Sequence, residues 1–152
     1  MQQLLQEVIV LVKEAGDFIR KEAQAFDKSK IEYKGKNDLV SYVDKETEKF
    51  IVAGLSKILP GAGFIAEEGT STKRSDSYNW VIDPLDGTTN FTHGLPVYAI
   101  SVALLKRGEL TLGVVYDVSR DECFHATKGG GAFLNHMPIS VSPVKTIDKG
   151  LI

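Results

Sequence analysis

The chain has 152 residues, of which 43% are hydrophobic and 25% charged, so it can bury one ordinary core and is predicted to form one domain, 1–152. Its 18 basic and 20 acidic residues give a net charge of -2, which argues against a nucleic-acid-binding surface of the usual strongly basic kind. The single cysteine, Cys123, excludes a disulfide framework and a multi-cysteine zinc site, and it predicts a cytoplasmic location. Charged residues such as Glu7 and Lys13 interrupt the apolar N-terminal stretch, so we expect neither a signal peptide nor a membrane span.

The N-terminal part is predicted to be mainly helical. Apolar residues recur at three-to-four spacing over 4–23, which is the pattern of a long amphipathic helix. A short strand is expected at 31–33, followed by a polar loop at 34–38. A second helix is expected to begin at 41–44, where Ser and Asp form a variant of the capping box, and to end at 59–61, Leu-Pro-Gly.

The rest of the chain is predicted to be mainly antiparallel sheet. A short apolar strand at 63–66 ends at Glu67 and Glu68, and a polar loop follows at 70–77. Further strands are expected from Tyr78 onward, at 97–105, at 110–116 and at 123–126, with turns and short strands between 129 and 138. Two helices followed by such strands make an α+β fold, with both helices packed on the sheet.

The stretch from Trp80 to Phe91 carries the first chemical signal. Its apolar start predicts a strand, and Pro84 pushes Asp83 toward extended geometry and is expected to end that strand. Asp83-Pro84-Leu85-Asp86 has the composition of a β-turn, whose ends lie within about 7 Å of each other. The two aspartate carboxylates are therefore expected to converge.

The residues after this turn predict a short helix. Gly87 tolerates backbone conformations that other residues resist, and Thr88 or Thr89 is expected to cap the helix. The first N–H groups of such a helix would point back at the two carboxylates. Anionic oxygens beside a positive helix end predict a site for a metal-bound phosphate.

Three other acidic residues have more than one interpretation on local pattern alone. Asp44 is most simply a residue that caps a helix or interacts with its dipole. Glu67 and Glu68 on an extended chain point to opposite sides, so one of them can face inward while the other meets solvent.

The complete stretch 80–91 closely resembles the signature of the inositol monophosphatase family, within the larger magnesium-dependent, lithium-sensitive phosphatase superfamily. The sequence at 64–68, Phe-Ile-Ala-Glu-Glu, resembles the upstream acidic motif of that family. The sequence at 38–44, Asp-Leu-Val-Ser-Tyr-Val-Asp, resembles the entry to its second helix. The order and spacing of the three motifs fit, and the resemblance extends over essentially the whole chain.

The resemblance implies a magnesium site and assigns its ligands. Glu67, Asp83 and the Leu85 carbonyl would ligate one Mg²⁺, and Asp83 and Asp86 would ligate a second. A third, weaker Mg²⁺ would lie near Glu67 through water, and lithium would inhibit. Glu68 is expected to be less directly engaged than Glu67. These oxygen donors are the kind that magnesium prefers.

The same resemblance assigns the substrate-binding and catalytic residues. Glu67, Asp86, Gly87 and Thr88 would adjoin the bound phosphate, the last two through backbone N–H groups. Thr88 and Asp44 would position and deprotonate the attacking water. The implied reaction is direct hydrolysis of a phosphate monoester such as inositol monophosphate, without a phosphoenzyme, releasing an alcohol and inorganic phosphate.

The resemblance also sets expectations for the whole molecule. It implies the N-terminal half of a layered αβαβα sandwich, because the C-terminal α/β half of the family and its Trp-Asp-x-Ala-Ala-Gly-like motif do not occur in these 152 residues. An exposed apolar edge is then expected to cause homodimerisation, aggregation or association with a missing C-terminal half. No nucleic acid or membrane partner is expected.

Alternatives to this function stay open. Fructose bisphosphate and phosphoadenosine phosphate are substrates of related phosphatases, and the residues expected to select the alcohol are absent. A non-catalytic or incomplete metal-binding module is the second reading. A metal-dependent glycosyltransferase is disfavoured, because the Asp spacing is wrong and the sequence shows no nucleotide-binding unit.

Overall fold

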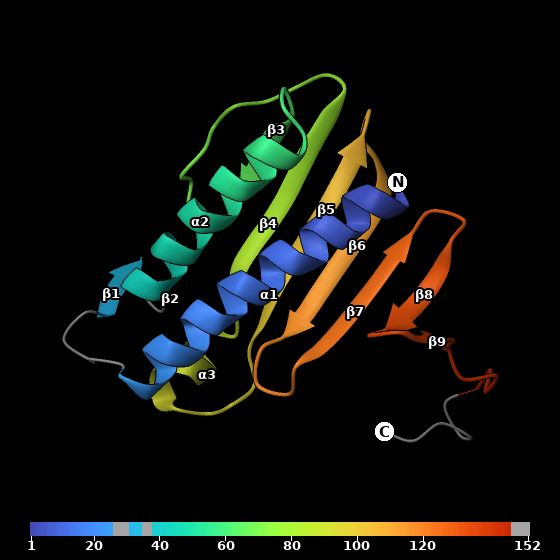
Figure 1. Cartoon of the computed structure of the whole chain (residues 1–152). Helices are drawn as coiled ribbons and strands as arrows, with labels where there is room; N and C mark the ends of the chain where they lie inside the picture. Colours follow the sequence, from blue (N-terminus) through green and yellow to red (C-terminus); the bar gives the residue numbers. More distant parts are fainter. Residues whose placement is uncertain (26–30, 35–37, 147–152) are drawn as a thin grey trace.

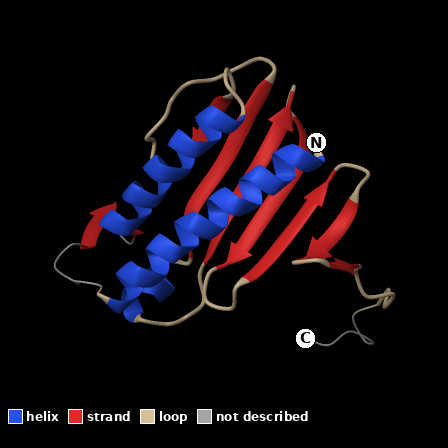
Figure 2. Cartoon of the chain, viewed as in Figure 1, coloured by secondary structure: helices blue, strands red, loops and turns tan. Residues whose placement is uncertain are grey.

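Two long helices lie side by side on one face of a seven-stranded sheet in the computed structural model, which describes residues 1–25, 31–34 and 38–146 (Figure 1). The helices are α1 (Gln2–Gln24), α2 (Tyr42–Ile58) and the short α3 (Thr88–His93). The first strands in chain order are β1 (Ile31–Lys34), β2 (Asp38–Ser41), β3 (Gly63–Ala66) and β4 (Tyr78–Asp86). They are followed by β5 (Ala99–Lys106), β6 (Glu109–Asp117), β7 (Glu122–Thr127), β8 (Gly131–Leu134) and β9 (Met137–Ile139). The expected α+β class, with its long helices and mainly antiparallel sheet, is confirmed (Figure 2).

Strand order in the large sheet follows the chain, β3-β4-β5-β6-β7-β8-β9. Every neighbouring pair is antiparallel except β3 and β4, which are parallel. The segment between them returns along β3, where the amide of Phe64 donates to the carbonyl of Lys73 at 2.7 Å. The expected polar loop at 70–77 therefore makes the connection. β1 and β2 form a separate antiparallel hairpin.

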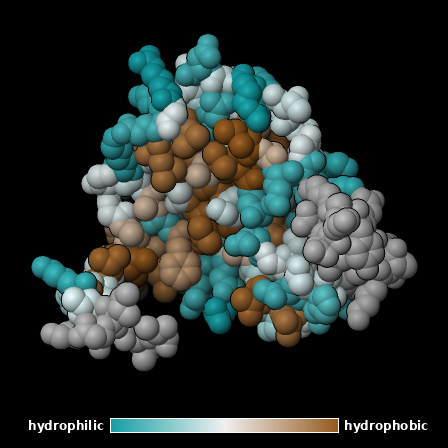
Figure 3. Space-filling model, turned by 180° about the vertical axis from the view of Figure 1, so that it is seen from behind, coloured by the Kyte–Doolittle hydropathy of each residue, from teal (hydrophilic) through white to brown (hydrophobic). Residues whose placement is uncertain are grey.

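The core lies between the helices and one face of the sheet. Alternate residues of the central strands are buried there, as period-two patterning requires: Trp80 and Ile82 on β4, Ile100, Val102 and Leu104 on β5, and Leu112, Val114 and Tyr116 on β6. α2 lies over β4, and α1 over β6 and β7. Seen from the opposite side, apolar residues gather on the face of the sheet that the helices leave uncovered (Figure 3).

Four local predictions were wrong. Asp83–Asp86 is not a β-turn, because β4 continues to Asp86 and changes register against β5 between these two residues. Proline lacks a backbone N–H, and such an irregularity is where a strand tolerates it. Gly87, rather than Thr88 or Thr89, is the N-cap of α3.

The other two errors concern strands. The backbone from Asp38 to Ser41 forms β2, where a loop and a helix entry were expected, and β9 occupies residues expected to form a turn. Residues 35–37 of the expected polar loop lie outside the described residues. The side chains of 38–41, including the Ser of the expected capping box, also lie outside them.

Candidate active site

The parallel pairing of β3 and β4 brings two predicted metal ligands to the same end of the two strands. Their last paired residues are Ala66 and Ile82, so Glu67 and Asp83 follow at matching positions on neighbouring strands. The carboxyl ends of parallel strands meet at one edge, which is where α/β proteins commonly bind ligands. The start of α2 and the whole of α3 lie at this same end of the molecule (Figure 1).

The irregularity in β4 shapes the predicted metal-binding segment. The amide of Leu85 donates to Asp83 Oδ1 at 3.2 Å, which turns this carboxylate toward the backbone of its own strand. The Leu85 side chain is 1% exposed and anchors the segment in the core. Asp86, the last residue of β4, is exposed to solvent. One buried apolar side chain thus holds a stretch whose two acidic groups remain accessible to a ligand.

Gly87 joins β4 to α3 in a place that only glycine fits. Its φ is 95°, in the left-handed region that residues with a Cβ disfavour. A Cβ at this position would lie 2.8 Å from the carbonyl oxygen of Val97 and 3.3 Å from the Cα of Tyr98. Its own carbonyl accepts the amide of Phe91 at 3.0 Å and starts the helix. The sharp turn places Thr88 at the first helical position.

Thr88 and Asp44 meet across 44 residues of sequence. The Thr88 hydroxyl lies 3.0 Å from Asp44 Oδ2 and 2.9 Å from the Leu85 carbonyl oxygen. A hydroxyl has one proton and two lone pairs, so Thr88 donates to one of these acceptors at a time. Asp44, in the first turn of α2, is 4% exposed. The structure therefore brings together the two residues predicted to act on the attacking water.

Burial, and secondly the charges of neighbouring acidic groups, raises the pKa of two aspartates at the site. Burial, opposed by the hydrogen bond from Thr88, raises the pKa of Asp44 to about 7, with smaller contributions from the negative charges of Glu68, Glu67 and Asp83. Burial is the main cause that raises the pKa of Asp83 to about 7, and the negative charges of Glu67 and Asp86 contribute to the increase. Perturbed carboxyl groups gathered in one place are characteristic of functional sites.

The donor atoms are of the kind that suits magnesium. Glu67, Asp83 and Asp86 offer carboxylate oxygens, and Leu85 offers a carbonyl oxygen. Burial is the main cause of the raised pKa of Asp83, and a divalent cation among these groups would relieve the repulsion from Glu67 and Asp86 that adds to it. Within the described ranges, no three His, Cys, Asp or Glu side chains already converge as ligands of one metal ion.

One buried acidic residue of this region was not predicted. Glu48 on α2 is 0% exposed and accepts hydrogen bonds from Glu68 and Thr70. The sequence signal that could have identified Glu48 is its place four residues after Asp44, which puts both charged residues on the same face of the helix. Such a position is unfavourable for a carboxylate unless donors meet it there.

Comparison with protein families gives a match over the whole chain. The model of the inositol monophosphatase family matches residues 1–152. An inositol-1-monophosphatase of Mesorhizobium japonicum is 38% identical over 147 residues, covering 95% of this chain and 55% of the relative. An inositol monophosphatase of Dictyostelium discoideum is 42% identical, with coverage of 100% and 57%. A relative named Nus factor SuhB, from Vibrio cholerae, is 39% identical, with coverage of 100% and 57%.

Solved structures agree with these relatives. The IMPase of Thermotoga maritima superimposes with a TM-score of 0.86 at 37% identity, covering 94% of this chain and 55% of that one. The extragenic suppressor protein SuhB of Bartonella henselae gives a TM-score of 0.87 at 34% identity, with coverage of 93% and 55%. This chain spans about half the length of the relatives that it matches. Its sequence and its fold together place it in the inositol monophosphatase family.

Proposed function

We propose that this chain provides the catalytic groups for magnesium-dependent hydrolysis of a phosphate monoester, with inositol monophosphate as the first substrate to test. The observation that carries the proposal is the Thr88–Asp44 hydrogen bond at 3.0 Å, beside the carboxylates at the ends of β3 and β4. Relatives at 38% and 42% identity are named inositol monophosphatases, which supports the choice of substrate.

Four residues are proposed to hold magnesium. Glu67, Asp83 and the Leu85 carbonyl would bind one ion, and Asp83 and Asp86 a second, with a third ion held near Glu67 through water. When bound, magnesium polarises the phosphate and lowers the pKa of a coordinated water. Glu67 and Asp86 would also border the substrate phosphate, as would the backbone N–H groups of Gly87 and Thr88.

The protein's own part in the reaction is to orient a water and accept its proton. When the Thr88 hydroxyl donates to Asp44, its lone pairs can accept a hydrogen bond from a water molecule. A carboxylate with a pKa near 7 is well matched to general-base catalysis at neutral pH. Attack of the water on phosphorus would form the new P–O bond and break the ester P–O bond. The proton accepted by Asp44 is returned through solvent to the leaving oxygen, which gives the alcohol and inorganic phosphate.

A second reading has its own support. The chain spans about half the length of its relatives, so it also fits a metal-binding unit that is inactive without further residues. In that case magnesium would bind to the chain, and no phosphate would be released from any substrate.

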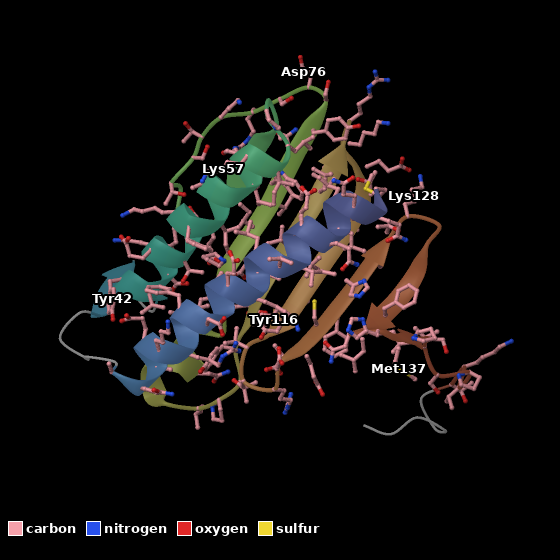
Figure 4. The ribbon with its side chains drawn as sticks, in the orientation of Figure 1. Tyr42, Lys57, Asp76, Tyr116, Lys128 and Met137 are labelled. Atoms are coloured by element: carbon pink, nitrogen blue, oxygen red, sulfur yellow. The ribbon has the colours of Figure 1, made fainter. Side chains whose placement is uncertain are left out.

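The decisive experiment measures phosphate release from inositol monophosphate while magnesium is titrated. We expect Asp86→Asn and Thr88→Ala to abolish turnover, and Asp76→Asn to leave it unchanged. Asp76 is an exposed aspartate at the far end of the sheet, and Figure 4 labels it well away from Tyr42 at the start of α2. Parallel assays with fructose bisphosphate and phosphoadenosine phosphate would identify the preferred substrate.

Calorimetric titration with magnesium alone separates the two readings. If the chain binds magnesium but releases no phosphate, and Asp86→Asn abolishes the binding, the result would support the second reading, a metal-binding unit that is inactive without further residues. Neither binding nor turnover would overturn both readings, and the chain would then share only its ancestry with the phosphatases.

Cytoplasmic location and homodimerisation belong to the same proposal. Cys123 is a free, buried thiol, as expected of a protein that does not depend on an oxidising compartment. In the described part of the chain, every helix is too short or too polar to cross a membrane. Fractionation of cells would test the location.

A further inference from the structure

Glu48 is a buried carboxylate on α2 that has no role in the proposed catalytic scheme. Glu48 is 0% exposed and lies among the residues that α2 packs against the rest of the molecule. An ionised carboxylate removed from water is strongly destabilising unless it accepts hydrogen bonds. Its partners therefore indicate what it does.

All three donors to Glu48 come from the loop that follows β3. The amide of Glu68 donates to Oε2 at 2.6 Å. The amide and the hydroxyl of Thr70 donate to Oε1 at 2.8 Å and 2.7 Å. Each carboxylate oxygen thus accepts at least one hydrogen bond, and charge-assisted bonds of this kind are about twice as strong as neutral ones.

These bonds act on the residue proposed to bind magnesium. The Glu68 N–H belongs to the same planar peptide unit as the Glu67 carbonyl. Holding this N–H in place fixes one side of Glu67 and so restricts the direction in which its side chain leaves the backbone. Without the bonds to Glu48, the segment at 67–70 would lose a connection to the helix.

Asp44 and Glu48 lie four residues apart, on the same face of one helix. Asp44 contacts the start of α3 through Thr88, and Glu48 contacts the loop after β3 through Glu68. A single rigid turn of α2 therefore sets the distance between the proposed water-positioning pair and the proposed metal ligand.

We propose that Glu48 is a positioning residue that orients Glu67 for cation binding by fixing the loop 67–70 to α2. The inference rests on the proposed function, since it concerns how the same site is built. Glu48 itself touches neither substrate nor metal in this scheme, and outer residues that orient ligands typically change metal affinity by about 10–100-fold when mutated.

The experiment measures the Mg²⁺ dissociation constant of the 152-residue chain by calorimetry, in wild type and in Glu48→Gln, Thr70→Val and Thr70→Ser. Glutamine keeps the shape of the side chain but replaces one acceptor oxygen with a donor that opposes an N–H. Valine removes the Thr70 hydroxyl at an exposed position, and serine restores it. Glu46→Gln is the matched control, because Glu46 is exposed on the same helix and pairs with Lys49 instead.

We expect Glu48→Gln to weaken Mg²⁺ binding about tenfold or more, Thr70→Val to weaken it less, and Thr70→Ser and Glu46→Gln to resemble wild type. Amide hydrogen exchange at Glu68 and Thr70, measured without metal, should accelerate in Glu48→Gln. Urea unfolding would confirm that each variant is folded during the titration.

Two results would overturn the inference in distinguishable ways. If Glu48→Gln lowers stability but binds Mg²⁺ like wild type, Glu48 is merely structural, and the proposed function stands. If the wild-type chain binds no Mg²⁺, the proposed function fails, and the positioning role fails with it.

Discussion

Individual residues at the site are constrained by backbone geometry as much as by chemistry. Gly87 combines a φ of 95° with a close approach to the backbone of Val97. Gly94, at the other end of α3, has a φ of 75°, but a Cβ added to it would point into open space. A side chain at either glycine would strain the backbone, but only at Gly87 would a Cβ also clash with the backbone of Val97 and Tyr98, in the segment between α3 and β5.

Replacing these glycines tests that distinction. Gly94→Ala should lower the free energy of unfolding by about 1–2 kcal/mol, the cost of a left-handed residue with a Cβ. Gly87→Ala should lower it by at least about 1 kcal/mol more, since an overpacked site adds about 1–3 kcal/mol. Urea denaturation would measure both, and equal losses would contradict the steric argument.

The raised pKa of Asp44 predicts how stability depends on pH. Its pKa is about 7 in the folded chain against an ordinary value of 3.8, so the folded state binds more protons than the unfolded state between these values. The stabilising contribution is complete below about pH 4 and is lost as the pH rises through about 7.

Without magnesium, we therefore expect the chain to be more stable at about pH 5 than at about pH 8, with Asp83 adding a change of the same sign. Asp44→Asn should flatten this dependence by on the order of 1–3 kcal/mol, as each pKa unit corresponds to about 1.4 kcal/mol. Thermal unfolding across this range would measure it. Wild-type stability that rises over the same range would contradict the assigned shift.

At the scale of elements, α1 is held on the sheet by close contact with β6. Gly16 on α1 faces Tyr116, whose side chain is 0% exposed and lies between helix and sheet (Figure 4). The Tyr116 hydroxyl donates to Asp121 at 2.7 Å and accepts from Arg20 at 3.0 Å. The small residue on the helix thus makes room for a ring whose hydroxyl connects α1 to the β6–β7 turn.

Gly16→Ala tests this packing through the sign of its effect. In an open helix, alanine stabilises relative to glycine by about 1 kcal/mol. Here a Cβ would lie 2.4 Å from Tyr116 Cε1, so we expect a loss of about 1–3 kcal/mol instead. Gly113→Ala on β6 is the control, because a Cβ there would meet no atom within 4 Å. A stabilised Gly16→Ala chain would refute the close packing.

At the scale of the whole molecule, the sheet has one covered and one uncovered face. The uncovered side includes partly exposed apolar residues from several strands, namely Leu110 and Val115 on β6, Phe124 on β7 and Ile139 on β9. They line a depression on this face of the sheet, and Figure 3 shows apolar residues gathered on the same face. Contiguous apolar surface of this kind usually marks an interface.

We therefore predict that the 152-residue chain self-associates through this face. Val115→Thr combined with Phe124→Thr should weaken association about tenfold or more, because each buried aliphatic or aromatic side chain contributes about 1.5–3 kcal/mol. Val10→Thr, at an exposed site on α1, is the control. Sedimentation velocity over a range of concentrations would measure this, and a monomeric wild-type chain would contradict it.

The sequence by itself determined most elements of this protein and which residues form its candidate site. The apolar run at 97–105, followed by a turn at 106–109 and a second strand-like run at 110–116, predicts a hairpin of strands. The spacing of apolar residues along 4–23 predicts α1, because it is the pattern of an amphipathic helix. Asp44, Glu67, Asp83 and Thr88 were predicted as one site because their motifs resemble those of a family to which the chain belongs.

Tertiary structure alone decided how these parts meet. Whether Asp83 and Asp86 bracket a turn or an irregular strand depends on pairing with β5, which a local composition rule does not include. Likewise, the sequence around Glu48 does not show why a charged residue is buried there, because its three hydrogen-bond donors lie in a loop 20 to 22 residues away. Hydrogen bonds between distant segments form only in the folded chain, so local sequence patterns predict the elements, and packing determines the geometry of the site.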